Sequence, residues 1–270
     1  MADYLLKPVP GDGRLTATVA GRDQSGQPVE TAVVVERPLT LYLNDQEIVT
    51  MMTVGDHPNY LAAGYLINQN MLPDPKTITG IEFDEDLDVV VVRTATETDH
   101  EAKLKRRTLT SGCAQGTVFG NMMERFDQIE LNPDASLKAS WLQTLSRAIT
   151  ETPSLYLAAG AIHGCVLCEA DKPLIYMEDV GRHNAVDKIA GYMALNGIPA
   201  RDKILYTTGR LTSEMVIKTV QMEIPILVSR SGFTAWGVEL AQTAGLTLIG
   251  RAKGKRFLAL AGTERIDYDA

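Results

Sequence analysis

The feature that most constrains the fold is the regular alternation of strand and helix patterns in the second half of the chain. Short aliphatic and β-branched runs, typical of buried strands, occur at residues 155–158, 174–177, 204–206, 224–228 and 246–249. Helical patterns precede or separate them, at residues 136–149, 184–195, 213–222 and 236–244. Strand, helix and strand in this order predict an α/β layer with helices packed on a sheet.

The first half of the chain has a different sequence pattern, in which short strand-like runs are often interrupted. Such patterns, β-branched or alternating, occur at residues 31–35, 39–43 and 87–93. An amphipathic helical segment begins at His57, and Pro73 stops it. We therefore expect a mostly β domain with at least one helix over residues 1–133, and an α/β domain over residues 134–270. The overall class would be α+β.

Composition narrows the class of protein further. The 270 residues are 45% hydrophobic and include only 3 cysteines, which excludes a disordered chain and a disulfide scaffold. The formal net charge of −8 argues against non-specific binding of nucleic acid, which needs a basic surface. The first residues lack an apolar signal core, and no run approaches the ~18 apolar residues of a membrane span. We expect a soluble cytoplasmic protein that uses neither nucleic acid nor a membrane.

The first candidate for chemistry is Cys113, in the segment LTSGCAQGT at residues 109–117. Its small and polar neighbours predict a loop in which a second large molecule can approach the sulfur. The four cations between residues 103 and 107 would favour the thiolate over the thiol. The same pattern also fits an ordinary turn with a spectator thiol.

The other two cysteines form a Cys-x-x-Cys pair, Cys165 and Cys168, close to His163. Such a pair suggests zinc or redox chemistry, but no second ligand pair has a suitable spacing, and only His183 could add a ligand. A zinc deaminase would need a glutamate where Cys165 stands. We favour two buried small residues beside a hydrogen-bonded histidine, just after the strand expected at 155–158, and we expect no metal.

The most informative segment is EDVGRHNAVDK, residues 178–188. An apolar strand there leads into a polar turn and then a helix, for which Gly181 permits the turn and Asn184 can act as the cap. Six ionisable groups fall within these eleven residues. A solvated helix start explains part of that charge, but α/β proteins also gather ligands at the carboxyl ends of their strands.

Three further strand ends combine glycine with cations. Gly209 and Arg210 precede a helix, Arg230 and its neighbours follow the next strand, and residues 249–256 hold four cations and two glycines. Backbone N–H groups at a helix start beside an arginine can hold an anion. Neither the Walker nor the dinucleotide fingerprint is present, so ATP and NAD are not indicated. Residues 249–256 also fit a basic hairpin, but three such strand ends predict a large anionic ligand.

The segment EDVGRHNAVDK resembles the FdhD family, the sulfur carriers needed for formate dehydrogenase activity, both in its residues and in their order. The resemblance continues in GRLTSE at 209–214, IPILVSRSGFTAWGVELA at 224–241 and LTLIGRAKGKRF at 246–257. It is looser in the first half, where LTLYLND and the helix at 57–72 fit the family, and it covers nearly the whole chain.

The resemblance implies a cytoplasmic accessory protein that acts as a sulfurtransferase or sulfur carrier through a cysteine persulfide. Such a protein accepts sulfur from a cysteine desulfurase. It hands the sulfur to Mo-bis(molybdopterin guanine dinucleotide), its cargo, before that cofactor enters the formate dehydrogenase apoenzyme. The resemblance also implies a homodimer, and a three-layer C-terminal domain similar to cytidine deaminase but without its zinc.

The resemblance also assigns residues. Cys113 falls on the catalytic persulfide cysteine of the family. The segment that binds the guanylyl cofactor falls on Ile249, Gly250, Arg251, Ala252, Lys253 and Gly254, beside the anion seat predicted at Gly209 and Arg210. Many members have a second cysteine in the Cys113 loop, where this chain has Gly116. We therefore expect Cys113 to carry the persulfide alone, unless the fold brings Cys165 or Cys168 near, and His183 to orient groups or exchange protons.

Two alternatives stay open. A non-catalytic chaperone would shield the molybdenum cofactor without using Cys113, and persulfide formation on that cysteine separates it from a sulfur carrier. A zinc hydrolase would use a deaminase-like pocket, and the metal content of the purified protein separates it from both. The missing glutamate already counts against the hydrolase.

Overall fold

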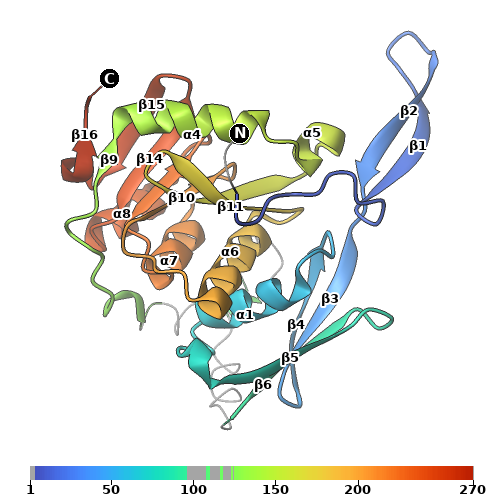
Figure 1. The fold of residues 1–270 in the computed structure, drawn as a ribbon, viewed down its shortest axis with the longest axis horizontal. Coiled ribbons are helices and arrows are strands. Elements are labelled where there is room, and N and C mark those ends of the chain that lie inside the picture. The colour runs from blue at the N-terminus through green and yellow to red at the C-terminus, as the bar shows by residue number, and fades with distance from the viewer. Residues whose placement is uncertain (1–3, 96–107, 110–115, 118–122, 124, 270) are drawn as a thin grey trace.

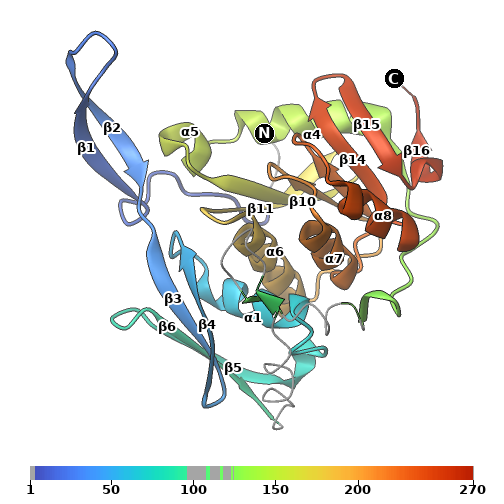
Figure 2. The ribbon, with the colours of Figure 1, turned by 180° about the vertical axis from the view of Figure 1, so that it is seen from behind.

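The protein is represented by a computed structural model that describes residues 4–95, 108–109, 116–117, 123 and 125–269. Its elements are stacked in layers (Figures 1 and 2). A six-stranded sheet is covered by helices on both faces, and one further helix joins this unit to a smaller, four-stranded sheet. The chain is thus a mixed α/β protein, as the alternating sequence patterns predict.

The larger sheet contains, in spatial order, β11 (Lys172–Asp179), β10 (His163–Glu169), β12 (Lys203–Thr207), β13 (Ile226–Ser229), β14 (Thr247–Lys253) and β15 (Arg256–Ala261). The middle strands β12, β13 and β14 run parallel, and β10 and β15 flank them in the antiparallel direction. Strands β12 and β13 are buried along their whole length, because parallel strands carry helices on both faces of their sheet.

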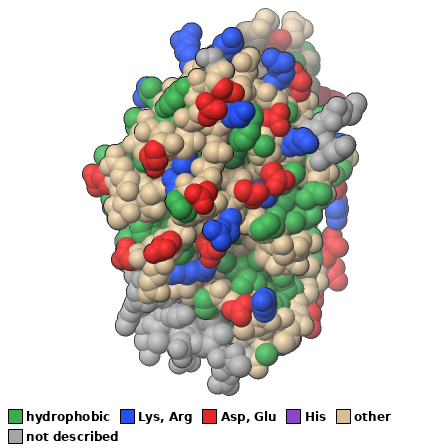
Figure 3. Space-filling view, turned by 60° about the vertical axis from the view of Figure 1, so that its left-hand side comes forward, with side chains coloured by type: hydrophobic (Ala, Val, Ile, Leu, Met, Phe, Trp, Pro, Cys, Tyr) green, Lys and Arg blue, Asp and Glu red, His purple; other side chains and the backbone are tan. Residues whose placement is uncertain are grey.

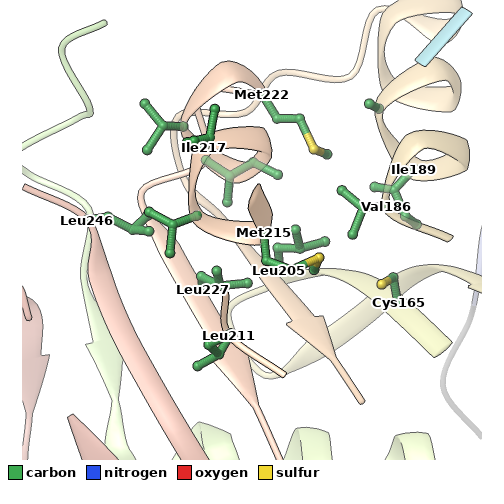
Figure 4. Packing of buried hydrophobic residues seen from close by; sticks show 14 of the residues in the cluster. Cys165, Val186, Ile189, Leu205, Leu211, Met215, Ile217, Met222, Leu227 and Leu246 are labelled. Atoms are coloured by element: carbon green, nitrogen blue, oxygen red, sulfur yellow. The ribbon is translucent and has the colours of Figure 1, made fainter. Parts of the chain in front are cut away.

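Helices cover both faces of the larger sheet. On one face lies α4 (Ala139–Glu151), whose Leu142, Leu145 and Ile149 recur every three to four residues and face the strands. The other face carries α6 (Arg182–Asn196), α7 (Ser213–Gln221) and α8 (Ala235–Thr243). Figure 4 shows the aliphatic and sulfur-containing side chains that fill the space between these helices and the strands.

The smaller sheet contains, in spatial order, β4 (Gln46–Thr53), β3 (Arg37–Leu43), β6 (Val89–Thr94) and β5 (Ile78–Asp84). Leu39, Leu41 and Leu43 alternate with more exposed residues along β3, so one face of this sheet is apolar. Helix α1 (Pro58–Asn68) covers that face. A short 3-10 turn, η1 (Pro75–Thr77), leads from the helix side into β5.

Helix α1 packs backbone to backbone against α6. A Cβ atom at Gly64 would lie 1.7 Å from the carbonyl oxygen of Asp187, and one at Gly191 would lie 1.9 Å from that of Tyr60. Neither position therefore accepts a side chain. This contact fastens the smaller sheet, through α1, to the helical layer of the larger one.

The remaining elements are short or peripheral. Strands β1 (Thr16–Arg22) and β2 (Pro28–Val34) form an exposed antiparallel ribbon that projects from the body (Figures 1 and 2). The other short elements are β7 (Thr108–Leu109) paired with β8 (Gly116–Thr117), β9 (Leu137–Lys138) paired with β16 (Ile266–Asp267), helix α5 (Leu155–Ala159) and η2 (Thr263–Arg265).

One expected strand is wrong. Residues 155–158 form helix α5, and the strand lies just beyond them as β10. The Ser154 hydroxyl accepts from the Leu157 N–H, which caps the start of the helix. Gly160 ends it with a φ of 65°. The strand pattern at β10 is hard to recognise in the sequence because Gly and Cys interrupt its aliphatic residues, although both residue types are common in protein cores.

Most other expected elements are confirmed, within a few residues at their ends. Helix α4 begins at Ala139, because Leu137 and Lys138 pair with β16 instead. Layers of helix, sheet and helix are present, whereas the likeness to cytidine deaminase and the domain boundary at residue 133 stay predictions. Within the described ranges, no helix is long and apolar enough to span a bilayer.

Candidate functional site

The predicted strand-end loops meet at one edge of the larger sheet. The parallel strands β12, β13 and β14 all end there. Strand β11 ends at the same edge, and β10 begins there, because His163 pairs with Asp179 and Cys165 with Thr207. This carboxyl edge is where open α/β sheets bind their ligands.

Hydrogen bonds hold these loops to one another. The Ser229 hydroxyl donates to the Gly209 carbonyl at 2.6 Å. The Leu211 N–H donates to the Gly232 carbonyl at 2.9 Å, and the Arg251 N–H donates to the Ser231 carbonyl at 2.7 Å. The structure thus brings together Gly209, Arg210 and the β13 and β14 ends, which sequence reasoning placed at separate strand ends.

The segment 249–254 is the end of β14 and its turn into β15 rather than a loop. The side chains of Ile249 and Ala252 are buried among residues that face α4, so they cannot contact a ligand. Arg251 and Lys253 are exposed. Gly254 makes the turn with a φ of 59°, and Gly250 leaves room for Phe233, whose ring would lie 2.5 Å from an added Cβ.

A basic cleft of about 940 Å³ opens beside this hairpin. Among the described residues, its lining includes no acidic side chain and consists of Arg230, Ser231, Gly232, Arg251, Lys253, Lys255, Arg256, Phe257 and Leu258. Its five cations take part in none of the ion pairs found in the described part of the chain. By contrast, acidic and basic side chains are interspersed over the face shown in Figure 3. In a chain with a net charge of −8, this cleft is a local concentration of positive charge, which attracts anions.

Arg230 links the basic cleft to helix α5. Its guanidinium carbon lies 5.5 Å from the centre of the Tyr156 ring, in a cation–π contact. Helix α5 is anchored in turn by Glu178, whose carboxylate accepts from the Leu155 and Tyr156 N–H groups at 2.7 and 3.1 Å. Burial raises the pKa of Glu178 to about 6, although those two hydrogen bonds oppose the shift.

Next to Gly209 lie two arginines and a histidine. The Arg182 side chain crosses Gly209, where an added Cβ would come within 2.9 Å of its Cδ. Burial lowers the pKa of the half-buried His163, and the nearby charges of Arg182 and Arg210 lower it further. His163 Nδ1 lies 3.5 Å from the Thr208 hydroxyl. Burial and the two arginine charges thus both favour the neutral form of the His163 imidazole.

Much of the charge in EDVGRHNAVDK is structural. Lys188 is completely buried and binds Asp179, with Nζ and Oδ2 2.6 Å apart, and it also pairs with Asp56. Asp179 accepts from the Thr53 hydroxyl at 2.5 Å and from the Gly181 N–H at 3.1 Å. This network fixes the turn between β11 and α6. Sequence reasoning missed Thr53 and Asp56, which lie more than a hundred residues away.

A second buried ion pair joins α6 to α7. Lys218 Nζ lies 2.6 and 2.8 Å from the two carboxylate oxygens of Asp187. The Asn68 amide, at the end of α1, donates to the same carboxylate at 2.7 Å. The last two charged residues of the motif, Asp187 and Lys188, thus tie the first half of the chain to the second.

His183 lies at the first turn of α6, almost fully buried. Its Nε2 is 3.0 Å from Oε2 of Glu214, in the first turn of α7. Burial lowers the pKa of His183, and the Glu214 carboxylate opposes that shift. Its Nδ1 has no hydrogen-bond partner among the described residues. The predicted role of His183 in proton exchange stays a prediction.

Comparison with known proteins agrees with this architecture. Residues 34–267 match the model of the FdhD/NarQ family. The chain belongs to the FdhD/NarQ family. A relative from Bacillus subtilis, named sulfur carrier protein FdhD, is 30% identical over 245 residues, which span 88% of this chain and 91% of the relative. One from Wolinella succinogenes with the same name is 31% identical over 245 residues, or 89% and 84% of the two chains.

A solved structure extends the comparison to the fold. It is described as a formate dehydrogenase accessory protein of Desulfotalea psychrophila, and it superimposes with a TM-score of 0.75 at 26% identity. The match covers 93% of this chain and 98% of the other. The FdhD/NarQ assignment therefore rests on sequence and on fold.

Cys165 and Cys168 of this FdhD/NarQ chain point to opposite faces of the larger sheet. Cys165 packs toward α6 and α7, and Cys168 packs toward α4, as residues three apart on a strand do. They cannot share a metal ion or form a disulfide with each other. Burial raises the pKa of Cys165 to about 12 and also raises that of Cys168. The interpretation as two buried small residues is confirmed, but they lie within a strand.

The predicted persulfide cysteine, Cys113, lies outside the described residues, as do the cations at 103–107 and most of the surrounding loop. The paired strands β7 and β8 stand on either side of it in the sequence. Among the residues that the structure describes, no three His, Cys, Asp or Glu side chains are grouped to hold a metal ion.

Proposed function

We propose that this chain is a sulfur carrier for formate dehydrogenase. It takes sulfur from a cysteine desulfurase as a Cys113 persulfide and hands it to Mo-bis(molybdopterin guanine dinucleotide) before that cofactor enters the apoenzyme. The observation that carries the proposal is the basic cleft at the carboxyl edge of the sheet, whose cations pair with no acidic group among the described residues. Family membership supports the same role.

The chemistry of the cleft suits a nucleotide arm of the cargo. Phosphate oxygens accept charge-assisted hydrogen bonds from arginine and lysine, and Arg251, Lys253 and Arg256 all line the same space. Phe257 and Leu258 add an apolar wall for a base or a pterin. Ile249 and Ala252 hold the backbone of this hairpin in place from inside the core.

The proposed transfer begins with a thiolate. The Cys113 thiolate attacks the outer sulfur of the donor's persulfide, the S–S bond of the donor breaks, and the donor cysteine leaves as a thiolate. The new Cys113 persulfide then presents its terminal sulfur to the molybdenum centre. Cys165 and Cys168 take no part, because both thiols are buried and their pKa values are raised. We propose that the protein works in the cytoplasm as a homodimer.

Intact mass after incubation with a cysteine desulfurase and cysteine tests this function. Wild-type protein should gain about 32 Da, the mass of one sulfur, and lose it on treatment with a reductant. The variant Cys113→Ala should gain nothing. Cys165→Ala is the matched control, because it removes a buried thiol and should leave the gain unchanged.

The outcomes separate the competing functions. An equal gain in mass by wild type and Cys113→Ala would show that another residue carries the sulfur. No gain on either protein, together with retained binding of guanosine diphosphate, would favour the chaperone that shields the cofactor without a persulfide.

A further inference from the structure

A second cleft lies on the N-terminal half of the molecule, beside the end of β11, because its lining residue Asp56 shares Lys188 with Asp179. This N-terminal cleft, of about 440 Å³, is lined by the segment before β1, the start of β3, the loop before α1 and the end of β5. The strands and helix that carry these segments are labelled in Figure 1. The volume of the cleft falls within the range of small-molecule sites. Nothing in the proposed sulfur transfer uses it.

The N-terminal cleft contains an arginine that has no counter-ion in the part of the chain that the structure describes. Arg37 forms no ion pair or hydrogen bond with the described residues, and its Nε is buried without a partner. Its stem lies over Gly55, where an added Cβ would come within 2.7 Å of the Arg37 Cδ. The φ of 85° at Gly55 is one that glycine adopts without strain. The backbone thus makes room for a cation whose charge no residue in the described ranges neutralises.

The acidic groups of the cleft are mostly engaged elsewhere. Asp12 binds Arg14, with its oxygens 2.7 to 3.2 Å from the guanidinium nitrogens, and Asp56 pairs with Lys188. Glu85 remains, 66% exposed, and its one ion pair is a long contact of 3.9 Å to Arg14. Arg37 and Glu85 therefore line the same cleft with opposite charges but do not pair with each other.

Apolar groups occupy the rest of the lining. Val9 and the half-buried Phe83 form the accessible apolar wall, with Leu15 and Val54 buried behind it. The loop before α1 has an unusual backbone conformation at His57, whose φ is 50° immediately before Pro58. A residue before proline normally avoids such conformations, and local strain of this kind is concentrated at binding sites. The cleft therefore combines a free cation, a rim carboxylate and an apolar wall.

We propose that the N-terminal cleft binds a free α-amino acid with a small apolar side chain. The ligand carboxylate pairs with the Arg37 guanidinium, a geometry that favours two parallel hydrogen bonds. The ligand ammonium meets the Glu85 carboxylate, and the side chain packs on Val9 and Phe83. A zwitterion is the ligand whose carboxylate and ammonium match the Arg37 guanidinium and the Glu85 carboxylate, which among the described residues is held only by the long contact to Arg14.

Calorimetric titration of the full chain with L-valine tests this site. Isovalerate lacks the amino group of valine and isobutylamine lacks its carboxylate, so each probes one half of the proposed contact. We expect saturable binding of valine, and affinities lower by about tenfold or more for the other two, equivalent to one lost ionic contact. Isovalerate or isobutylamine binding as tightly as valine would overturn the zwitterion assignment.

Two variants locate the binding. Arg37→Gln should weaken valine binding by about tenfold or more, whereas Arg93→Gln, an exposed arginine paired with Glu82 outside the cleft, should leave it unchanged. Glu85→Gln is a second, independent variant for the case in which Arg37→Gln does not fold, because Glu85 is exposed. It should weaken the binding of valine but not that of isovalerate, which has no amino group. No saturable binding by wild type up to about 10 mM valine, or full binding by both cleft variants, would refute the site.

Discussion

The ammonium group of Lys188 lies 2.6 Å from the carboxylate of Asp179, and neither side chain reaches solvent. Asp56 binds the same ammonium from the first half of the chain, and the Glu178 carbonyl accepts from it at 3.0 Å. One lysine thus neutralises carboxylates from both halves of the protein.

Replacing this lysine should be strongly destabilising. Lys188→Met leaves Asp179 and Asp56 without their shared counter-ion, and a buried carboxylate that loses its partner costs about 3–5 kcal/mol. Urea unfolding should show a loss of this size. Lys172→Met, at an exposed position in β11, serves as control and should change stability by less than about 0.5 kcal/mol. Similar losses for the two variants would contradict the structural role of Lys188.

The contact between α1 and α6 makes a second prediction. Gly64→Ala places a methyl group 1.7 Å from the Asp187 carbonyl, so the helices must separate and the smaller sheet must move with α1. We expect a loss of about 3 kcal/mol or more in unfolding free energy, at the upper end for overpacking. Gly80→Ala is the matched control, because no atom lies within 4 Å of a Cβ there. A stable Gly64→Ala protein would show that the helices are less tightly apposed.

Stability should depend on pH through Glu178. Its pKa is raised from 4.5 to about 6 in the folded protein, so folding favours the protonated acid. Its contribution to stability is full below about pH 4.5 and is lost as the pH rises through about 6, by about 2 kcal/mol in total. The unfolding free energy of wild type, minus that of Glu178→Gln, should fall by this amount between about pH 4 and pH 7. A difference that stays constant over this range would contradict the shift.

The basic cleft should bind guanosine diphosphate. Arg256→Gln and Lys253→Gln each remove one unpaired cation, and we expect each to raise the dissociation constant by about tenfold, the value of one hydrogen bond to a charged group. Lys76→Gln, which changes the same charge on an exposed turn far along the chain, should not alter binding. Binding by wild type should weaken as salt increases. Equal effects of all three variants would indicate a non-specific charge effect.

Alkylation should show that Cys165 and Cys168 are inaccessible in the native protein. In the native protein, Cys165 and Cys168 should resist iodoacetamide, because both are fully buried and the pKa of Cys165 is about 12. In about 8 M urea both should react, as mass spectrometry of the peptides would show. Rapid labelling of Cys168 under native conditions would instead mean that the α4 side of the sheet opens readily.

Local sequence patterns predicted the layered half of the fold well. The stripe of Leu142, Leu145 and Ile149 and the turn at Gly197, with its φ of 64°, are local signals, and both are found in the structure. The strand predicted at residues 155–158 is wrong because apolar composition alone does not distinguish a short helix from a strand. The deciding feature was the cap formed by Ser154.

The site could be predicted only in part. Parallel strands end at a common edge, so the grouping of Gly209, Arg230 and Arg251 follows from the strand order. The partners of Asp179 and Lys188 lie 126 and 132 residues away, at Thr53 and Asp56, and such contacts leave no local pattern.

A register shift near Gly250 hid the burial of part of the predicted binding segment. Arg251 adopts a φ of 54°, and the pairing of β14 with β15 slips between Gly250 and Lys253. As a result, Ile249 and Ala252 both face α4, although strict alternation would separate them.

The glycine contact between α1 and α6 has a mechanical consequence. Two backbones in direct contact cannot slide along each other, because the neighbouring side chains would collide with the opposite helix. The two sheets therefore behave as one rigid frame with no hinge at this joint. Movements that admit or release the proposed cargo would then come from loops carried on the frame, such as the turn between β14 and β15, while the frame itself keeps its shape.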